Sequence, residues 1–366
     1  MEQELIVRDG PMLRTAGSRR PFFYSGVNNY YLAIDNTRRE VVDEIVASMG
    51  AMGMNVLRTW AFNEAQDKET KLQGPLPGRF IEQNFRMLDY TLDRLAAGGM
   101  RAILALTNYW PAYGGMRQYM AWNSGGKSES FYRSPAAQED YRRFVEMLVQ
   151  RVNTCNGLPY RADPTILAWQ LANEPRNERA SRGSANDLTS WINDTARFLK
   201  RTLGVAQLVS VGMEGFYARG NANVGGRRWM DACGTDFVAQ HASDDIDLMG
   251  FHLYPDHWKL TDDKAERWIV AHARDARKLG KPVILDEVGR MVPPHSVAVR
   301  DASLRRYLRV AADEGVCGTN VWMLSHNGHP NFDNFAIYHP GDAFTVQLLR
   351  EHASHVRRLD DLPTIT

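Results

Sequence analysis

The chain has 366 residues, of which 44% are hydrophobic and 24% charged, a balance typical of a folded globular protein and not of a disordered one. Its 44 Lys and Arg against 43 Asp and Glu give a formal net charge of +1, so we expect neither nucleic acid nor an acidic membrane surface as a partner. No run of 18 apolar residues is present, so the sequence predicts no membrane span.

The beginning of the chain and its cysteines give further limits. The first 18 residues are polar and lack the apolar stretch of a signal peptide, so we expect a cytoplasmic protein if Met1 is the native start and a secreted one if a signal was removed. Cys155, Cys233 and Cys317 are far apart, and their spacing predicts neither a disulfide framework nor a zinc site.

Short apolar runs alternate with segments of helical periodicity along the chain. The predicted strands are Pro21–Asn28, Met54–Trp60, Arg101–Asn108, Ile166–Ala172, Gln207–Met213, Asp247–Tyr254, Pro282–Glu287 and Val316–Met323. The predicted helices between them are Val41–Met52, Phe85–Ala97, Gln138–Val152, Leu188–Leu203, Lys264–Leu279 and Asp301–Glu314. The strand runs are continuously apolar, which is typical of parallel strands covered on both faces.

Eight β-then-α units predict a (β/α)8 TIM barrel, and we expect residues 1–366 to form a single barrel domain with long βα loops. The alternative is a doubly wound Rossmann sheet, which would show a G-x-G-x-x-G motif after the first strand. The chain reads Val27-Asn28-Asn29-Tyr30-Tyr31 there, so the barrel is favoured.

The active site of a TIM barrel lies at the C-terminal ends of its strands. Polar and aromatic residues stand at nearly every predicted strand end: Asn28, Asn29, Tyr30, Arg58, Trp60, Asn108, Trp110, Asn173, Glu174, Glu214, His252, Tyr254, Glu287 and Trp322. Strand ends with a purely structural role would carry turn residues such as Gly, Asp and Ser. The pattern therefore predicts a binding cleft.

Two glutamates end apolar strands, Glu174 within Trp169–Pro175 and Glu287 within Pro282–Gly289. We expect strands four and seven to face each other across the barrel, so that the two carboxylates meet over its mouth. Acetal hydrolysis needs such a pair, one protonated and one ionised. Adjacent strand residues point to opposite faces, so only one of Asp286 and Glu287 is expected to face the mouth, and the bare sequence favours neither.

Other strand-end residues suit a sugar site. His252 and Tyr254 are two apart and share a face of their strand, where a tyrosine hydroxyl can hold a neighbouring carboxylate ionised. Arg58 can lower the pKa of an inward carboxylate by pairing with it. The aromatic candidates for stacking on sugar rings are Trp60, Trp110, Tyr113, Trp122, Trp258 and Trp322, with Trp322 as the floor of the site.

Two other classes of protein match part of this pattern. A metal-dependent hydrolase could draw ligands from His241, His252, Asp256 and His257, but its first strand usually carries a tight histidine pair, and this chain has Asn28 and Asn29 there. We therefore expect no catalytic metal and no cofactor. A non-catalytic sugar-binding barrel would keep the aromatic residues and lose one of the two glutamates.

Several stretches resemble glycoside hydrolase family 5, within the clan of retaining barrel glycosidases, and most of all its endo-β-1,4-mannanases. They are Gly26–Tyr31, Val56–Trp60, Leu171–Arg176, Gly212–Tyr217, His252–Trp258 and Lys281–Gly289, and the resemblance runs from about Pro21 to about Arg350. The Asn-Glu-Pro motif marks the clan, whereas Glu-Gly-Phe-Tyr and His-x-Tyr-Pro-Asp-His-Trp are more particular to the mannanases.

The resemblance implies roles for individual residues. Glu174 would be the acid/base and Glu287 the nucleophile, which decides for Glu287 over Asp286. Asn173 would bind the substrate 2-hydroxyl, and Arg176 would lie on the aglycone side. The candidate substrate-binding residues are then Arg58, Trp60, Asn108, Trp110, Asn173, Arg176, His252, Tyr254, Trp258 and Trp322.

The implied activity is retaining hydrolysis of β-1,4-mannosidic bonds in mannan or manno-oligosaccharides. Val288 departs from the pattern, because relatives commonly have an aromatic residue after the nucleophile. Some relatives are exo-acting because extra loops block one end of the cleft, and the loops that could do so here are Phe62–Phe80, Ala112–Ser130 and Ser325–Pro340. An exo-β-mannosidase or transglycosylase, a β-1,4-glucanase and a mannan-binding barrel remain the alternatives.

Overall fold

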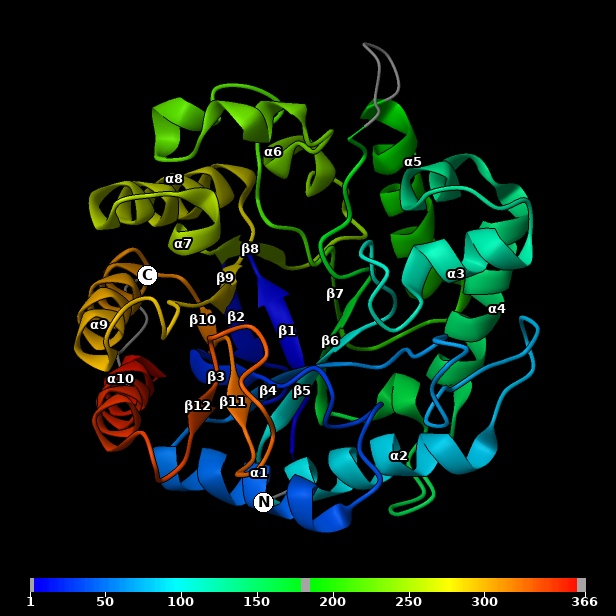
Figure 1. The fold of residues 1–366 in the computed structure, drawn as a ribbon, viewed down its shortest axis with the longest axis horizontal. Helices are drawn as coiled ribbons and strands as arrows, with labels where there is room; N and C mark the ends of the chain where they lie inside the picture. Colours follow the sequence, from blue (N-terminus) through cyan, green and yellow to red (C-terminus); the bar gives the residue numbers. More distant parts are fainter. Residues whose placement is uncertain (1–2, 179–184, 361–366) are drawn as a thin grey trace.

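A computed structural model describes residues 3–178 and 185–360, and a ring of eight parallel strands lies at its centre (Figure 1). The strands are β3 (Tyr24–Asn28), β4 (Val56–Trp60), β5 (Arg101–Ala105), β6 (Ile166–Gln170), β7 (Leu208–Ser210), β8 (Met249–Leu253), β9 (Val283–Val288) and β10 (Gly318–Val321). Their order is β7-β6-β5-β4-β3-β10-β9-β8, and a parallel bridge between Ser210 and Leu248 joins the two ends. The predicted (β/α)8 barrel is confirmed, and every strand coincides with one of the predicted runs.

Helices surround the ring of strands (Figure 1). Six correspond to the predicted ones: α1 (Arg39–Met52), α2 (Glu82–Ala97), α4 (Pro135–Gln150), α5 (Ala185–Arg197, continued by one π-helical turn over Phe198–Thr202), α8 (Asp262–Leu279) and α9 (Val297–Asp313). Local signals set their ends. In α8, for example, the Thr261 side chain accepts from the Lys264 backbone N–H, and Gly280 ends the helix at φ 64°. The sequence prediction omitted α10 (Ala343–Asp360), which buries Val346, Leu349, Ala353 and Val356 along one face.

The N-terminal end of the barrel is closed by a hairpin that the sequence prediction omitted. Strands β1 (Ile6–Asp9) and β2 (Met12–Thr15) pair antiparallel, and Ile6 and Leu13 pack with barrel residues such as Ile103 and Leu167. Figure 1 shows this hairpin across the middle of the ring. Burial of apolar surface stabilises this end as a packed core, so the opposite end is the one available for a site.

The connections on the C-terminal side of the strands carry short elements of their own. These are α3 (Gly115–Trp122), α6 (Phe237–Gln240), α7 (Pro255–Trp258), β11 (Leu324–Ser325) and β12 (Ile337–Tyr338). The loops predicted to be long therefore contain ordered structure, with α3 in the second and the β11–β12 pair in the third. Across residues 3–178 and 185–360, we find no helix with the length and apolar character needed to cross a membrane.

Candidate active site

The backbone turns sharply where β6 ends, and this turn presents Glu174. The Glu174 N–H donates to the Gly212 carbonyl at 2.8 Å, and Glu174 takes φ 50°, in the left-handed region. Gly212 also has a positive φ of 83°, and a Cβ there would collide with the Ala172 carbonyl. Only glycine lets the chain after β7 approach the end of β6 this closely. Non-glycine residues held at positive φ concentrate at functional sites.

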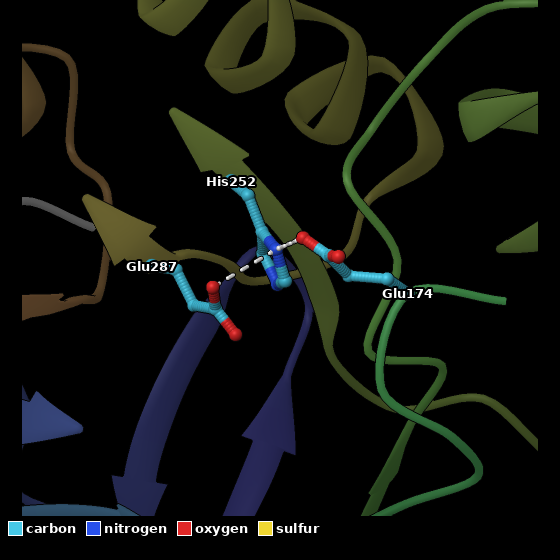
Figure 2. Close-up of side chains that lie close together, drawn as sticks. All are labelled: Glu174, His252 and Glu287. Carbon is cyan, nitrogen blue, oxygen red and sulfur yellow. Dashed lines mark hydrogen bonds and ion pairs between the residues drawn. The ribbon is translucent and has the colours of Figure 1, made fainter. Parts of the chain in front are cut away.

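Glu174 and Glu287 converge on one histidine at the mouth of the barrel (Figure 2). His252 Nδ1 lies 2.8 Å from Glu174 Oε1 and 3.5 Å from Glu287 Oε2. One carboxylate oxygen of each glutamate and a ring nitrogen of the histidine all lie within 4.8 Å of one another. The expectation that their strands face each other is wrong, because β7 and β8 alone separate β6 from β9 on that side of the ring. The side chains meet because both project toward the barrel axis.

Glu287 lies in a buried network centred on Arg58. Arg58 Nη1 donates to Glu287 Oε1 at 2.5 Å, and Tyr254 Oη donates to Glu287 Oε2 at 2.5 Å. The other guanidinium hydrogen bonds go to Asn28 Oδ1 at 3.0 Å, Asn173 Oδ1 at 2.8 Å and Gln170 Oε1 at 2.8 Å. Burial raises the pKa of Glu287, and the charges of His252 and Arg58 and the Tyr254 hydrogen bond oppose that rise. The network holds both carboxylate oxygens in place.

Asp286 and Glu287 both point into the barrel, which corrects the expectation that only one of them could. The register between β8 and β9 passes from Phe251–Leu285 to His252–Glu287, so Asp286 is skipped as in a β-bulge. The extra residue interrupts the alternation of side chains. Asp286 is completely buried, accepts a hydrogen bond from Gln170 Nε2 and lies 3.4 Å from Arg58 Nε, whereas Glu287 lines the cavity.

The surroundings of Glu174 favour its ionised form. Trp110 Nε1 donates to Glu174 Oε2 at 2.6 Å. Burial acts to raise the pKa of Glu174, but the hydrogen bond and charge of His252, the charge of Arg176 and the Trp110 hydrogen bond lower it to about 2. Burial acts to lower the pKa of His252, yet the charge of Glu287 and the contact with Glu174 raise it. The two shifts favour the ionised form of Glu174 and the protonated form of His252.

A cavity of about 560 Å³ opens above these groups. Its lining residues are Trp60, Asn108, Trp110, Ala112, Asn173, Glu174, Arg176, Glu214, Trp229, Tyr254, His257, Trp258, Glu287, Trp322, Asp333 and Phe335. Ten of the twelve predicted site residues line it, and the other two, Arg58 and His252, are buried beneath it in contact with the carboxylates. The structure thus brings together all twelve.

The predicted aromatic residues differ in what they contact. Trp322 lines the cavity, donates from Nε1 to Asp333 Oδ2 at 2.7 Å and stacks on Tyr30 with ring centres 5.8 Å apart. Tyr113 Oη donates to Asp35 at 2.7 Å, and Trp122 Nε1 donates to the Pro75 carbonyl at 2.8 Å. Tyr113 and Trp122 therefore join loops to one another, and the prediction that they stack on sugar is not supported by their positions.

Several cavity residues were missing from the predicted site. Glu214 ends the fifth strand run, which was a usable signal, and it binds Arg176 through both oxygens at 2.6 and 2.5 Å. Burial, followed by the charge of Glu174, raises the pKa of Glu214 to about 7. Trp229, Asp333 and Phe335 lie on loops, where position along the chain does not reveal which side chains reach the cavity.

The four candidate metal ligands do not converge. His241 Nδ1 contacts the Phe237 carbonyl at 2.7 Å, while Asp256 pairs with His295 at 2.8 Å and Arg290 at 3.2 Å. In the part of the chain that the structure describes, the one group with metal-ligand atoms close together is Glu174, His252 and Glu287. Arg58 and protonated His252 already place positive charge against Glu287, so this group does not fit a divalent cation.

Comparisons with known proteins identify the family of the chain. Residues 3–347 match the family model for GH family 5 beta-mannosidase-like proteins. The chain is 33% identical to mannan endo-1,4-beta-mannosidase 1 of Solanum lycopersicum, covering 91% of this chain and 87% of that protein. It is 33% identical to mannan endo-1,4-beta-mannosidase 5 of Arabidopsis thaliana, over 87% of this chain and 79% of the relative.

Solved structures give the same result. The endo-beta-1,4-mannanase from Thermotoga petrophila superimposes with a TM-score of 0.84 at 31% identity, covering 93% of this chain and 78% of the other. The endo-1,4-beta-mannanase from Rhizomucor miehei gives a TM-score of 0.83 at 27% identity, covering 97% and 99%. The resemblance expected from the sequence motifs is confirmed.

Proposed function

The chain belongs to glycoside hydrolase family 5, in its β-mannosidase-like group, and on that premise we propose that it is an endo-acting hydrolase of β-1,4-mannosidic linkages. Its substrate is mannan or a manno-oligosaccharide, as the names of its relatives suggest. Two acidic side chains in an aromatic-lined cavity at the barrel mouth support this function.

One observation carries the proposal: a single histidine nitrogen contacts both carboxylates, whose nearest oxygens lie within 4.8 Å. Retaining glycosidases hold their two carboxyl groups about 5–5.5 Å apart, whereas inverting enzymes need about 6.5–9.5 Å to admit a water molecule. The close approach of Glu174 to Glu287 therefore favours retention by two successive displacements.

In the first displacement, Glu287 attacks the anomeric carbon while the bond from that carbon to the glycosidic oxygen breaks. Arg58 and Tyr254 each hold one oxygen of the nucleophile at 2.5 Å, so its orientation is fixed before substrate arrives. Glu174 gives a proton to the departing oxygen, and the leaving chain exits as an alcohol. The product of this step is a covalent mannosyl ester of Glu287.

His252 is the source of the proton that Glu174 donates. In the empty site the pKa shifts favour ionised Glu174 and protonated His252, and Nδ1 lies 2.8 Å from Oε1. Bound sugar expels water, and loss of water disfavours the charged forms of both groups. The proton then moves from Nδ1 to Oε1, which leaves a neutral imidazole and a carboxylic acid beside the glycosidic oxygen.

The second displacement reverses the roles. Glu174 has given its proton to the departing oxygen and is ionised, and because ester formation has removed the charge of Glu287, Glu174 can serve as a base. It takes a proton from water, whose oxygen attacks the anomeric carbon as the bond to Glu287 breaks. Two inversions at the same carbon return the original β configuration.

Sugar recognition follows from the cavity wall. The side-chain Oδ1 of Asn173 accepts from Arg58, and its Nδ2 donates to Asn108 Oδ1 at 3.2 Å beside the cavity, where it can also donate to a sugar hydroxyl. Trp322 is held by its bond to Asp333 and offers a ring face to the apolar side of a mannose unit. Arg176 lies beyond Glu174 from Glu287, on the side of the leaving chain.

The function is tested with mannohexaose and cellohexaose, followed over time by chromatography. We expect early di- and trisaccharides from mannohexaose and no cleavage of cellohexaose. Glu287→Gln and Glu174→Gln should abolish cleavage, while Glu139→Gln, at an exposed glutamate on α4, should retain it. Release of single mannose units would favour an exo-mannosidase, cleavage of cellohexaose a β-glucanase, and tight binding without cleavage a mannan-binding barrel.

A further inference from the structure

Trp229 lies in the cavity wall on the leaving-group side of Glu174. It belongs to η5 (Arg228–Ala232), a short 3-10 helix between β7 and β8, and lines the cavity together with Trp110 and Arg176. Glu174 gives its proton to the departing oxygen, so the cavity wall beside Glu174 and away from Glu287 is the side of the leaving chain. Trp110 is hydrogen-bonded to Glu174, and Trp229 lines the same cavity.

Arg176 connects these two tryptophans. The central carbon of its guanidinium lies 4.9 Å from the ring centre of Trp110 and 5.9 Å from that of Trp229. Glu214 binds the guanidinium through two hydrogen bonds of 2.6 and 2.5 Å, so Arg176 has a fixed position between the rings. Contacts therefore run from Glu174 to Trp110, from Trp110 to Arg176, and from Arg176 to Trp229.

The ring of Trp229 is unusually exposed for its type. Trp229 is 44% exposed, whereas the next residue, Met230, is fully buried. The ring makes a T-shaped contact with Phe216, with ring centres 5.5 Å apart, and Trp229 lines the cavity. Exposure of a tryptophan in a cavity, beside charged and polar groups, is typical of a surface that binds a ligand with both apolar and polar faces.

The turn that carries Trp229 is firmly attached to the barrel. Gly226 packs so closely on α8 that a Cβ there would lie 2.8 Å from the Trp268 ring, so the turn cannot lift without losing this contact. Asp231 Oδ1 accepts hydrogen bonds from the backbone and side-chain nitrogens of Asn221, at 3.1 and 2.6 Å. The exposed ring therefore has a fixed position before substrate binds, which reduces the entropy lost on binding.

We propose that Trp229 is the stacking platform for the second sugar of the leaving chain, counted from the bond that breaks. The inference rests on the proposed function and adds a preference in cleavage position. A mannose ring has an apolar face of C–H groups that packs on an indole, and Arg176 beside it donates to hydroxyls at the ring edge. Binding energy at this position favours cuts that leave two or more sugars on the departing side.

Mannotetraose tests the proposal because the lengths of its products show which bond was cut, and hence how many sugars lay on the leaving side. The wild-type enzyme should release mainly two molecules of mannobiose, and Trp229→Ala should shift the products toward mannotriose plus mannose. We expect kcat/KM for mannotetraose to fall roughly two- to twelvefold in this variant, the range for loss of one aromatic contact. Trp229→Phe keeps a ring and should restore most of the mannobiose. Phe344→Ala, which removes an exposed ring on the outer helix α10, is the matched control.

A 4-nitrophenyl β-mannobioside distinguishes loss of sugar stacking from a general disturbance of the fold, because its leaving group is too short to reach Trp229. We expect Trp229→Ala to hydrolyse this substrate at the wild-type rate. Wild-type product ratios and kcat/KM for mannotetraose in Trp229→Ala would overturn the inference, as would equal losses on both substrates. Failure of the wild-type enzyme on both substrates would instead overturn the proposed function, and the inference with it.

Discussion

Arg58 and Glu287 form an ion pair of 2.5 Å in which the arginine side chain is fully buried and the glutamate side chain is 4% exposed. The same guanidinium lies 3.4 Å from Asp286 and donates to Asn28, Gln170 and Asn173. Arg58 thus balances two carboxylates that the bulge in β9 turns into the barrel. The position of the nucleophile and the stability of the barrel mouth depend on one side chain.

Arg58→Met should destabilise the protein by about 3–5 kcal/mol, because it leaves two buried carboxylates without their cation. It should also abolish cleavage, since Glu287 loses the group that orients it. The free energy of unfolding is measured by urea denaturation. Arg305→Met is the control: its pair with Glu351 joins side chains that are 61% and 48% exposed, so the cost should be about 0–1 kcal/mol. Equal losses in the two variants would contradict this account.

Tyr254→Phe should move the acid limb of the pH dependence of kcat/KM to higher pH. That limb follows protonation of Glu287, whose pKa burial raises above 4.5 and the Tyr254 hydroxyl helps to lower. Removing the hydroxyl removes a stabilising bond to the carboxylate, so protonation occurs at higher pH. Tyr90→Phe, at a hydroxyl that binds Asp43 on the outside of the barrel, should leave the limb in place. A limb unmoved or lowered in Tyr254→Phe would contradict the role of this hydrogen bond.

The His252 imidazole should titrate at a higher pH than an ordinary histidine in the free enzyme. Its pKa is raised from 6.5, with the charge of Glu287 and the contact with Glu174 outweighing burial. Glu174→Gln removes one of the raising causes, so the midpoint of the His252 titration should fall. Nitrogen-15 NMR of labelled histidines measures both values. His241, whose pKa burial lowers to about 3, is an internal reference that should remain neutral from pH 5 to 8. A rise of the His252 midpoint in Glu174→Gln would contradict the shared-proton description.

Glu174→Ala should be rescued by azide on an aryl β-mannobioside. The activated leaving group departs without a proton, so the covalent ester on Glu287 still forms, but no base remains to activate water. Azide needs no base, and it should restore turnover and yield the β-mannobiosyl azide, identified by NMR. Glu287→Ala leaves a gap on the opposite face of the sugar, so any azide product from that variant should be α. A β product from Glu287→Ala would exchange the two assignments.

The barrel could be predicted from the sequence because its strands are buried on both faces. A run such as Ala102–Leu106 is continuously apolar, and such a run is typical of a parallel strand that is covered on both faces. The hairpin of β1 and β2 could not be predicted. Each strand is only four residues long, and contact with the end of the barrel stabilises it more than its own residue pattern does.

The candidate site could be predicted where residues end strands, and less well elsewhere. Glu174, His252 and Glu287 could be predicted as site residues because the strand ends of a TIM barrel converge. The bulge at Asp286 could not be predicted, because side chains alternate between faces only while both strands keep register. The positions of Trp229 and Asp333 at the cavity depend on how whole loops fold over the barrel mouth, and the residues next to them in the sequence do not indicate this.

The assignment of Glu287 as the nucleophile is tested most directly by trapping the glycosyl-enzyme with a 2-deoxy-2-fluoro-β-mannosyl fluoride. The label is then mapped by mass spectrometry of peptides. The fluorine at carbon 2 destabilises both transition states, and the fluoride leaving group lets the ester form faster than it hydrolyses. We expect one label per chain, on the peptide that contains Glu287, at Glu287 itself. A label on Asp286 or Glu174, or an active enzyme that never accumulates label, would contradict this assignment.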